Sequence, residues 1–136
     1  MIELGLRYGR GLALLREVAE SQRVSADYLE QIMAPLRRAG LVNAVRGAKG
    51  GYELTRPPSE ITVKQIMDVL EGGFGEAESD REKQETPPPK MRDSAATELW
   101  RKVEEAANQV LETTTLSDLC ERQLEKEREK APIYAI

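Results

Sequence analysis

The feature that most constrains the fold is a basic, glycine-rich segment between two short apolar segments. Residues 41–45 (LVNAV) and 52–55 (YELT) alternate apolar and polar side chains, and Arg46 to Gly51 between them contains three glycines. Glycine reaches the positive φ angles of a tight turn, and the alternation is typical of strands with one buried face. The pattern predicts a two-stranded antiparallel hairpin with a basic tip, ended by Pro57-Pro58.

Two helices joined by a tight turn are predicted before this hairpin. The first follows Gly11, shows apolar residues three and four apart, and ends in the break at residues 21–24; its apolar face is Leu12, Leu15, Val18 and Ala19. The second has Ser25 as its N-cap and ends at Gly40; its buried side is Tyr28, Leu29, Ile32, Met33 and Leu36. Residues 1–8 are expected to be the end of an earlier helix, closed by Gly9.

Further helices are predicted after the hairpin. One covers residues 61–70 and stops at Gly72-Gly73, and residues 75–93, rich in charge and proline, are interpreted as a flexible loop. A long helix then has an apolar stripe at heptad-like spacing, which predicts a homodimer through Leu99, Val103, Ala106 and Val110. A last helix begins near Thr115 or Ser117 and leads to an extended apolar tail.

These elements define the predicted fold class: mainly α with a small β-hairpin, a winged helix-turn-helix plus a long C-terminal dimerisation helix. The expected division is a winged helix-turn-helix DNA-binding domain at 1–74, a flexible loop at 75–94, and dimerisation helices with a C-terminal tail at 95–136.

Charge supports a double-stranded DNA partner once it is considered by region. The net charge of −4 argues against binding of nucleic acid, but residues 37–56 contain five basic residues and a single acidic one, Glu53. Arg46 at the hairpin tip suits a narrow minor groove, and Lys49 suits phosphate contacts. Arg37 and Arg38 fit phosphate contact and a solvated helix face equally well.

Composition excludes several other classes. With one cysteine and no histidine, the chain lacks the commonest general base, a zinc ligand set and any internal disulfide. We therefore expect no enzyme activity, no metal site and no cofactor. There is no apolar run long enough for a membrane helix and no signal-peptide pattern, so a cytoplasmic protein without membrane partners is predicted.

Three motifs resemble those of one bacterial family. Residues 25–31 (SADYLEQ), 34–42 (APLRRAGLV) and 45–52 (VRGAKGGY) are similar to the signature of the Rrf2-type transcriptional regulators, and the likeness resumes at 98–100 and 111–116. Members are homodimeric winged-helix proteins. The resemblance implies that Arg46 enters the minor groove and that five residues lie at the major groove: Ser25, Asp27, Tyr28, Glu30 and Gln31. A carboxylate such as that of Glu30 can accept a hydrogen bond from a cytosine amino group.

Departures from the family pattern narrow the prediction. Many members have three cysteines in the stretch that corresponds to residues 75–93, whereas this chain has none there, so no iron–sulfur cluster is expected. The chain resembles a cluster-free branch that represses genes of cysteine and sulfur metabolism. Its terminal Tyr134-Ala-Ile136 is similar to the tail with which serine acetyltransferase enters the active site of cysteine synthase, which predicts that enzyme (O-acetylserine thiol-lyase) as a co-repressor.

The chain begins where the first helix of family members would be ending, and loss of that segment would remove phosphate contacts. The main alternative function is therefore a winged-helix protein-interaction module that does not bind DNA.

Overall fold

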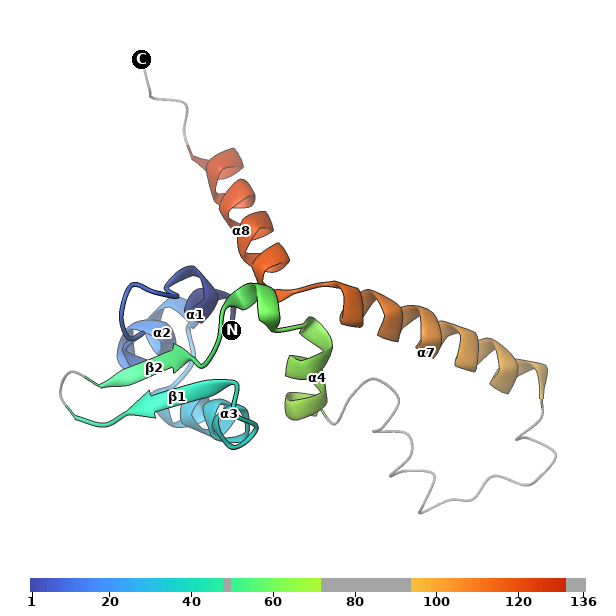
Figure 1. The fold of residues 1–136 in the computed structure, drawn as a ribbon, viewed down its shortest axis with the longest axis horizontal. Helices are drawn as coiled ribbons and strands as arrows, with labels where there is room; N and C mark the ends of the chain where they lie inside the picture. The colour runs from blue at the N-terminus through green and yellow to red at the C-terminus, as the bar shows by residue number, and fades with distance from the viewer. Residues whose placement is uncertain (48–49, 72–93, 132–136) are drawn as a thin grey trace. The chain divides into compact units, whose positions relative to one another are not determined.

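The computed structural model describes residues 1–47, 50–71 and 94–131. Figure 1 shows the order of elements: α1 (Ile2–Leu6), α2 (Leu15–Gln22), α3 (Ala26–Arg38), β1 (Val42–Val45), β2 (Gly51–Leu54), the short 3-10 helix η1 (Pro58–Glu60), α4 (Val63–Glu71), α7 (Ala95–Thr113) and α8 (Leu116–Lys130). The predicted class, mainly helical with one hairpin, is confirmed. The chain forms two compact units, one of Met1–Ile61 with the chain from Thr115 onward, the other of Thr62–Thr114.

The core of the first unit lies between the helices and one face of the hairpin. β1 and β2 pair antiparallel, with Val42 opposite Leu54 and Ala44 opposite Tyr52. Val42 and Leu54 are buried, whereas Asn43 and Glu53 on the other face are exposed. The largest fully buried side chains are Leu36, Ile61, Leu116 and Val42. They come from α3, the residue after η1, α8 and β1, and burying each contributes about 1.5–3 kcal/mol.

The segment before α2 is extended rather than helical. Ala13 forms a bridge with Tyr52: the N–H of each residue donates to the carbonyl of the other at 2.8 Å. The prediction that the helix includes Leu12 is therefore wrong, because α2 begins at Leu15. In this extended conformation the N–H and the carbonyl of Ala13 are both hydrogen-bonded to the hairpin, so they need no partner within a helix.

Helix α3 begins and ends where the sequence predicts. The Ser25 hydroxyl accepts a hydrogen bond from the Tyr28 N–H at 3.1 Å, which caps the helix, and Gly40 follows its last turn with a φ of 77°. Three apolar residues of α3 are buried against the core, namely Leu29, Met33 and Leu36. The prediction that Tyr28 is on this buried side is wrong, because its side chain is 53% exposed.

Helix α8 packs against α1 and η1 in the first unit. Its start has a capping box: the Thr115 hydroxyl accepts from the Asp118 N–H at 3.1 Å, and the Asp118 carboxylate accepts from the Thr115 N–H at 2.8 Å. Cys120 is buried at the α1 contact, where its Sγ lies 3.5 Å from the Ile2 carbonyl oxygen. Burial raises the pKa of the Cys120 thiol, so the thiol stays protonated at neutral pH.

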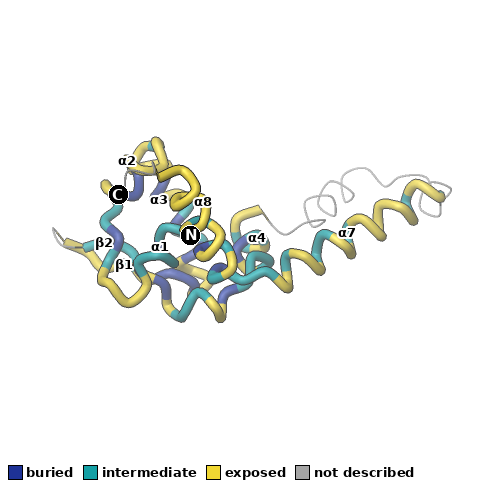
Figure 2. The backbone as a smooth tube through the Cα atoms, turned by 90° about the horizontal axis from the view of Figure 1, so that it is seen from above, coloured by how far each residue is buried: buried dark blue, intermediate teal, exposed yellow. Residues whose placement is uncertain are grey.

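In the second unit, α4 packs against the long helix α7. The Val63 N–H donates to the Thr114 carbonyl at 2.9 Å, and Ile66 is buried. No residue of α7 is buried, and the tube in Figure 2 is exposed or intermediate along its whole length. Among the described residues, no helix is both long and apolar enough to cross a membrane.

Candidate nucleic-acid interface

Helix α3 presents a continuous polar surface near its N-terminus. The side chains predicted to face the major groove, those of Asp27, Tyr28, Glu30 and Gln31, are all exposed. Ser25 is also exposed, but its hydroxyl already caps the helix. Helix α3 therefore has one buried apolar side and one exposed side, and the exposed side can enter the major groove of DNA, which is about 12 Å wide.

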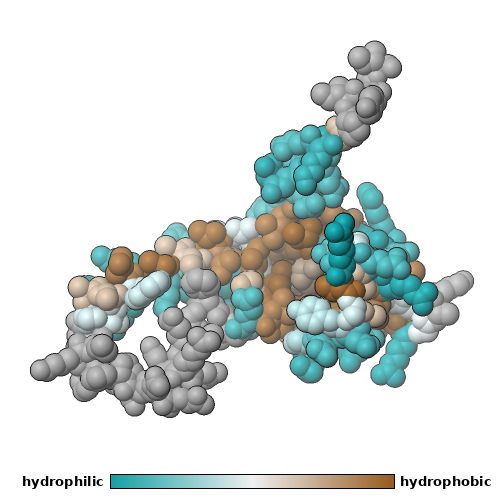
Figure 3. Space-filling model, turned by 180° about the vertical axis from the view of Figure 1, so that it is seen from behind, coloured by the Kyte–Doolittle hydropathy of each residue, from teal (hydrophilic) through white to brown (hydrophobic). Residues whose placement is uncertain are grey.

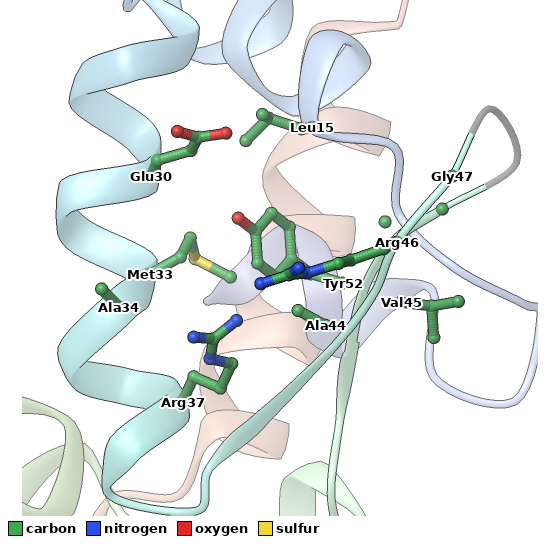
Figure 4. Close-up of a pocket in the computed structure, with 12 residues that line it drawn as sticks. Leu15, Glu30, Met33, Ala34, Arg37, Ala44, Val45, Arg46, Gly47 and Tyr52 are labelled. Carbon is green, nitrogen blue, oxygen red and sulfur yellow. The ribbon is translucent and has the colours of Figure 1, made fainter.

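A groove of about 490 Å³ separates α3 from the hairpin (Figure 4). Glu30, Met33, Ala34 and Arg37 form the wall contributed by α3. The other residues that line it come from the hairpin and the start of α2: Leu15, Ala44, Val45, Arg46, Gly47, Gly50, Gly51 and Tyr52. Two guanidinium groups, one from each wall, point into this groove. The fold thus brings Glu30 and Arg37 of α3 together with Arg46 of the hairpin, which the sequence predicted in two separate elements.

The cations of this groove have no acidic partner among the described residues. Arg7 pairs with Glu3 and Glu17, and Arg122 pairs with Glu125 and Glu129, but neither Arg37 nor Arg46 forms such a pair. An unpaired guanidinium can form two parallel hydrogen bonds to a phosphate or to a guanine edge. The groove is therefore suited to a ligand that has both phosphates and exposed base edges, as a nucleic acid does.

Tyr52 is a groove residue that the sequence analysis did not assign to the site. Burial raises the pKa of its phenol, the Glu30 carboxylate raises it further, and the Arg37 guanidinium opposes both. The signal for its position was the strand alternation, since Tyr52 is on the same face as the buried Leu54. Arg38, in contrast, is exposed and does not line the groove.

Several predicted site residues lie elsewhere. Lys49 at the hairpin tip and the tail residues Tyr134 and Ile136 are outside the described residues. Four predicted interface residues lie on α7 and are exposed: Leu99, Val103, Ala106 and Val110. Figure 3 shows apolar residues gathered along this helix.

Two helices in a tight turn followed by a hairpin beside the second helix define a winged helix-turn-helix, a class that docks on duplex DNA. Comparison with known proteins agrees. Residues 1–122 match the Rrf2 family, described as an iron-dependent transcriptional regulator. The chain belongs to the Rrf2 family of DNA-binding transcriptional regulators, and it is a regulator rather than an enzyme.

Individual relatives cover most of the chain. The transcriptional regulator CymR of Bacillus subtilis is 40% identical over 119 residues, which are 88% of this chain and 80% of that protein. The structure of CymR, the global cysteine regulator of B. subtilis, aligns with a TM-score of 0.69 and 37% identity over 89% of this chain and 87% of CymR. The structure of T. potens IscR aligns with a TM-score of 0.71 and 36% identity over 98% and 85% of the two chains.

The residues of this chain do not fit a cysteine-held iron centre, although the family description mentions iron. Such centres need several thiolates, or histidines in place of some of them. The whole chain has one cysteine and no histidine. That cysteine, Cys120, is buried against α1 with a raised thiol pKa, and thus it is a poor thiolate ligand.

Proposed function

We propose that the chain is a homodimeric repressor that binds promoter DNA of cysteine and sulfur metabolism genes in the cytoplasm. The observation that carries this proposal is the free face formed by α3 and the hairpin. In this proposal Arg46 enters the minor groove, and Lys49 and Arg37 contact phosphates. The residues that meet the major groove are Ser25, Asp27, Tyr28, Glu30 and Gln31. Among the residues that the structure describes, neither Arg37 nor Arg46 has an acidic partner, which supports these roles.

The exposed apolar face of α7 supports the homodimer. Leu99, Trp100 and Val110 are each 62% exposed, and Val103 is 41% exposed. Burying one such side chain contributes about 1.5–3 kcal/mol, so a matching helix of a second copy would gain substantially from covering this stripe. Dimeric helix-turn-helix proteins read two half-sites related by their two-fold axis, and we therefore expect a palindromic operator.

The dimer is tested by light scattering coupled to size-exclusion chromatography. Val110→Glu places a charge in the proposed interface and is expected to give a monomer. Gln109→Glu, at the adjacent exposed position, is the matched control and is expected to stay dimeric. A dimeric Val110→Glu variant would show that this stripe is not the interface.

The likeness to CymR, the global cysteine regulator of B. subtilis, supports the proposed role in cysteine metabolism. A terminal carboxylate on an apolar residue is a chemistry that enzyme active sites can capture, so the tail with Tyr134 and Ile136 is proposed to bind cysteine synthase. Fluorescence anisotropy with a promoter fragment from a cysteine-biosynthesis operon tests both proposals.

Selective, salt-sensitive binding that cysteine synthase strengthens is the expected result of that assay. Deletion of Ile136 is expected to abolish the enhancement while DNA binding by the chain alone remains. Binding by cysteine synthase that is unchanged after this deletion would contradict the co-repressor role. Absence of DNA binding under all conditions would favour the alternative, a winged-helix protein-interaction module.

A further inference from the structure

One polar residue of the groove has no role in the proposed DNA contacts. Tyr52 is on β2, opposite the wall formed by α3. Figure 4 shows its ring in the groove, at the level of α3 between Glu30 and Arg37, with the hydroxyl directed toward the helix. The residue therefore faces both charged side chains from the other element of the winged helix.

The backbone of Tyr52 is held firmly. Its N–H and carbonyl both pair with Ala13 at 2.8 Å, and across the hairpin it is opposite Ala44. Gly51, the residue before it, packs directly on the Ala13 carbonyl. Because two neighbouring segments fix this position, the ring has a more constant location than the long side chains that surround it.

Glu30 and Arg37 are seven residues apart on α3, which puts them on the same helix face about two turns from each other. Both are exposed, and neither has an ion-pair partner among the residues that the structure describes. Their charges act on the Tyr52 hydroxyl from either side, with Arg46 on the hairpin as the third charged group lining the groove. A phenol can donate one hydrogen bond and accept another.

We propose that Tyr52 is a positioning residue for DNA recognition: in the complex its hydroxyl donates to the Glu30 carboxylate and accepts from the Arg37 guanidinium. The inference rests on the proposed function of this face. These hydrogen bonds would hold two long side chains in the orientation that contacts DNA, and a hydrogen bond to a charged group contributes about a tenfold change in affinity or more. Tyr52 thereby links the recognition helix to the hairpin and sharpens base selection without touching a base.

The first test compares base selection by the full chain, Tyr52→Phe and the control Tyr8→Phe. Tyr8 is exposed and does not line this groove, so its variant removes a hydroxyl elsewhere in the same unit. Preferred duplexes are selected from a randomised library, and affinities are then measured for the preferred sequence and its single base-pair variants. Tyr52→Phe is expected to lower the ratio of specific to non-specific affinity roughly tenfold, the loss for one hydrogen bond to a charged group.

If the Tyr52 hydroxyl had a purely structural role, its removal would lower thermal stability instead, so thermal unfolding of both variants is also measured. The thermal midpoint and the salt dependence of Tyr52→Phe are expected to match those of the unmodified chain, because no phosphate contact is removed. Unchanged selectivity in Tyr52→Phe would overturn this inference alone. An unmodified chain that selects no sequence would overturn the proposed function and this inference with it.

A second measurement needs no DNA. Ultraviolet titration of the tyrosines, with Tyr52→Phe used to assign the phenol, follows the pKa of Tyr52 in Glu30→Gln and in Asp27→Asn. Glu30→Gln is expected to lower the pKa of Tyr52, because the Glu30 charge raises it. Asp27→Asn removes the other acid of α3, and its effect is expected to be smaller. A pKa of Tyr52 that does not respond to Glu30→Gln would contradict the proximity of Glu30 to the Tyr52 hydroxyl, on which the proposal rests.

Discussion

Replacing Gly51 with alanine tests the packing of the hairpin against the segment before α2. An added Cβ would collide with the Ala13 carbonyl oxygen and would lie 2.9 Å from the Ala13 carbonyl carbon and 3.2 Å from the Leu14 nitrogen. All three are backbone atoms, so no side chain can rotate away. Overpacking of this kind costs about 1–3 kcal/mol, and the two hydrogen bonds between Ala13 and Tyr52 would each lose about 1 kcal/mol if they stretched.

Gly51→Ala is therefore expected to lose about 3–5 kcal/mol of unfolding free energy, measured by urea denaturation followed by circular dichroism. The control is Gly9→Asn, because Gly9 has a φ of 78° with nothing near an added Cβ, and asparagine tolerates that conformation. Loss of less than about 0.5 kcal/mol in Gly51→Ala, which is the range of neutral surface substitutions, would refute the close approach of the hairpin to the segment before α2.

Three further predictions concern stability. Arg23 has a φ of 55° at the end of α2, so Arg23→Gly is expected to add about 1 kcal/mol in the same urea assay, and an equal gain in Arg23→Ala would contradict the role of the backbone. Thr115→Ala removes the cap of α8 and is expected to cost about 1 kcal/mol, whereas Thr115→Ser should retain the stability. Because burial raises the pKa of Cys120 in the folded state, its stabilising effect is complete below about pH 8.5 and declines as the pH rises through the folded value. Denaturation at several pH values checks this decline, which should be smaller in Cys120→Ala, because the raised pKa of Tyr52 still contributes a loss of the same sign.

The helix-turn-helix and the hairpin could be predicted from sequence because their signals are local. The N-cap Ser25 and Gly40 mark the ends of α3 through their own backbone requirements. The alternation around the glycine-rich turn likewise fixed which hairpin residues face inward. These patterns depend on neighbours within a few positions along the chain.

Other features depend on contacts between distant segments. The extended conformation at Ala13 results from pairing with Tyr52, 39 positions away in the numbering, which no helical periodicity can indicate. The packing of α8 on α1 joins the two ends of the described chain, and the apolar pattern of α8 specifies a buried face but not its partner. Tyr52 was missed for the same reason, since its role arises from the wall opposite it.

The salt dependence of DNA affinity in Arg46→Ala tests the central claim most directly. Each cation of the protein that displaces condensed counterions from the DNA, on a phosphate or in the strongly negative minor groove, contributes about 0.9 to the slope of log affinity against log salt concentration. Arg46→Ala is therefore expected to weaken binding and to reduce that slope by about 0.9. Arg122→Ala, at a cation on α8 that is already paired with Glu125 and Glu129, is expected to leave both unchanged. A slope and an affinity in Arg46→Ala equal to those of the unmodified chain would contradict DNA binding by the face of α3 and the hairpin.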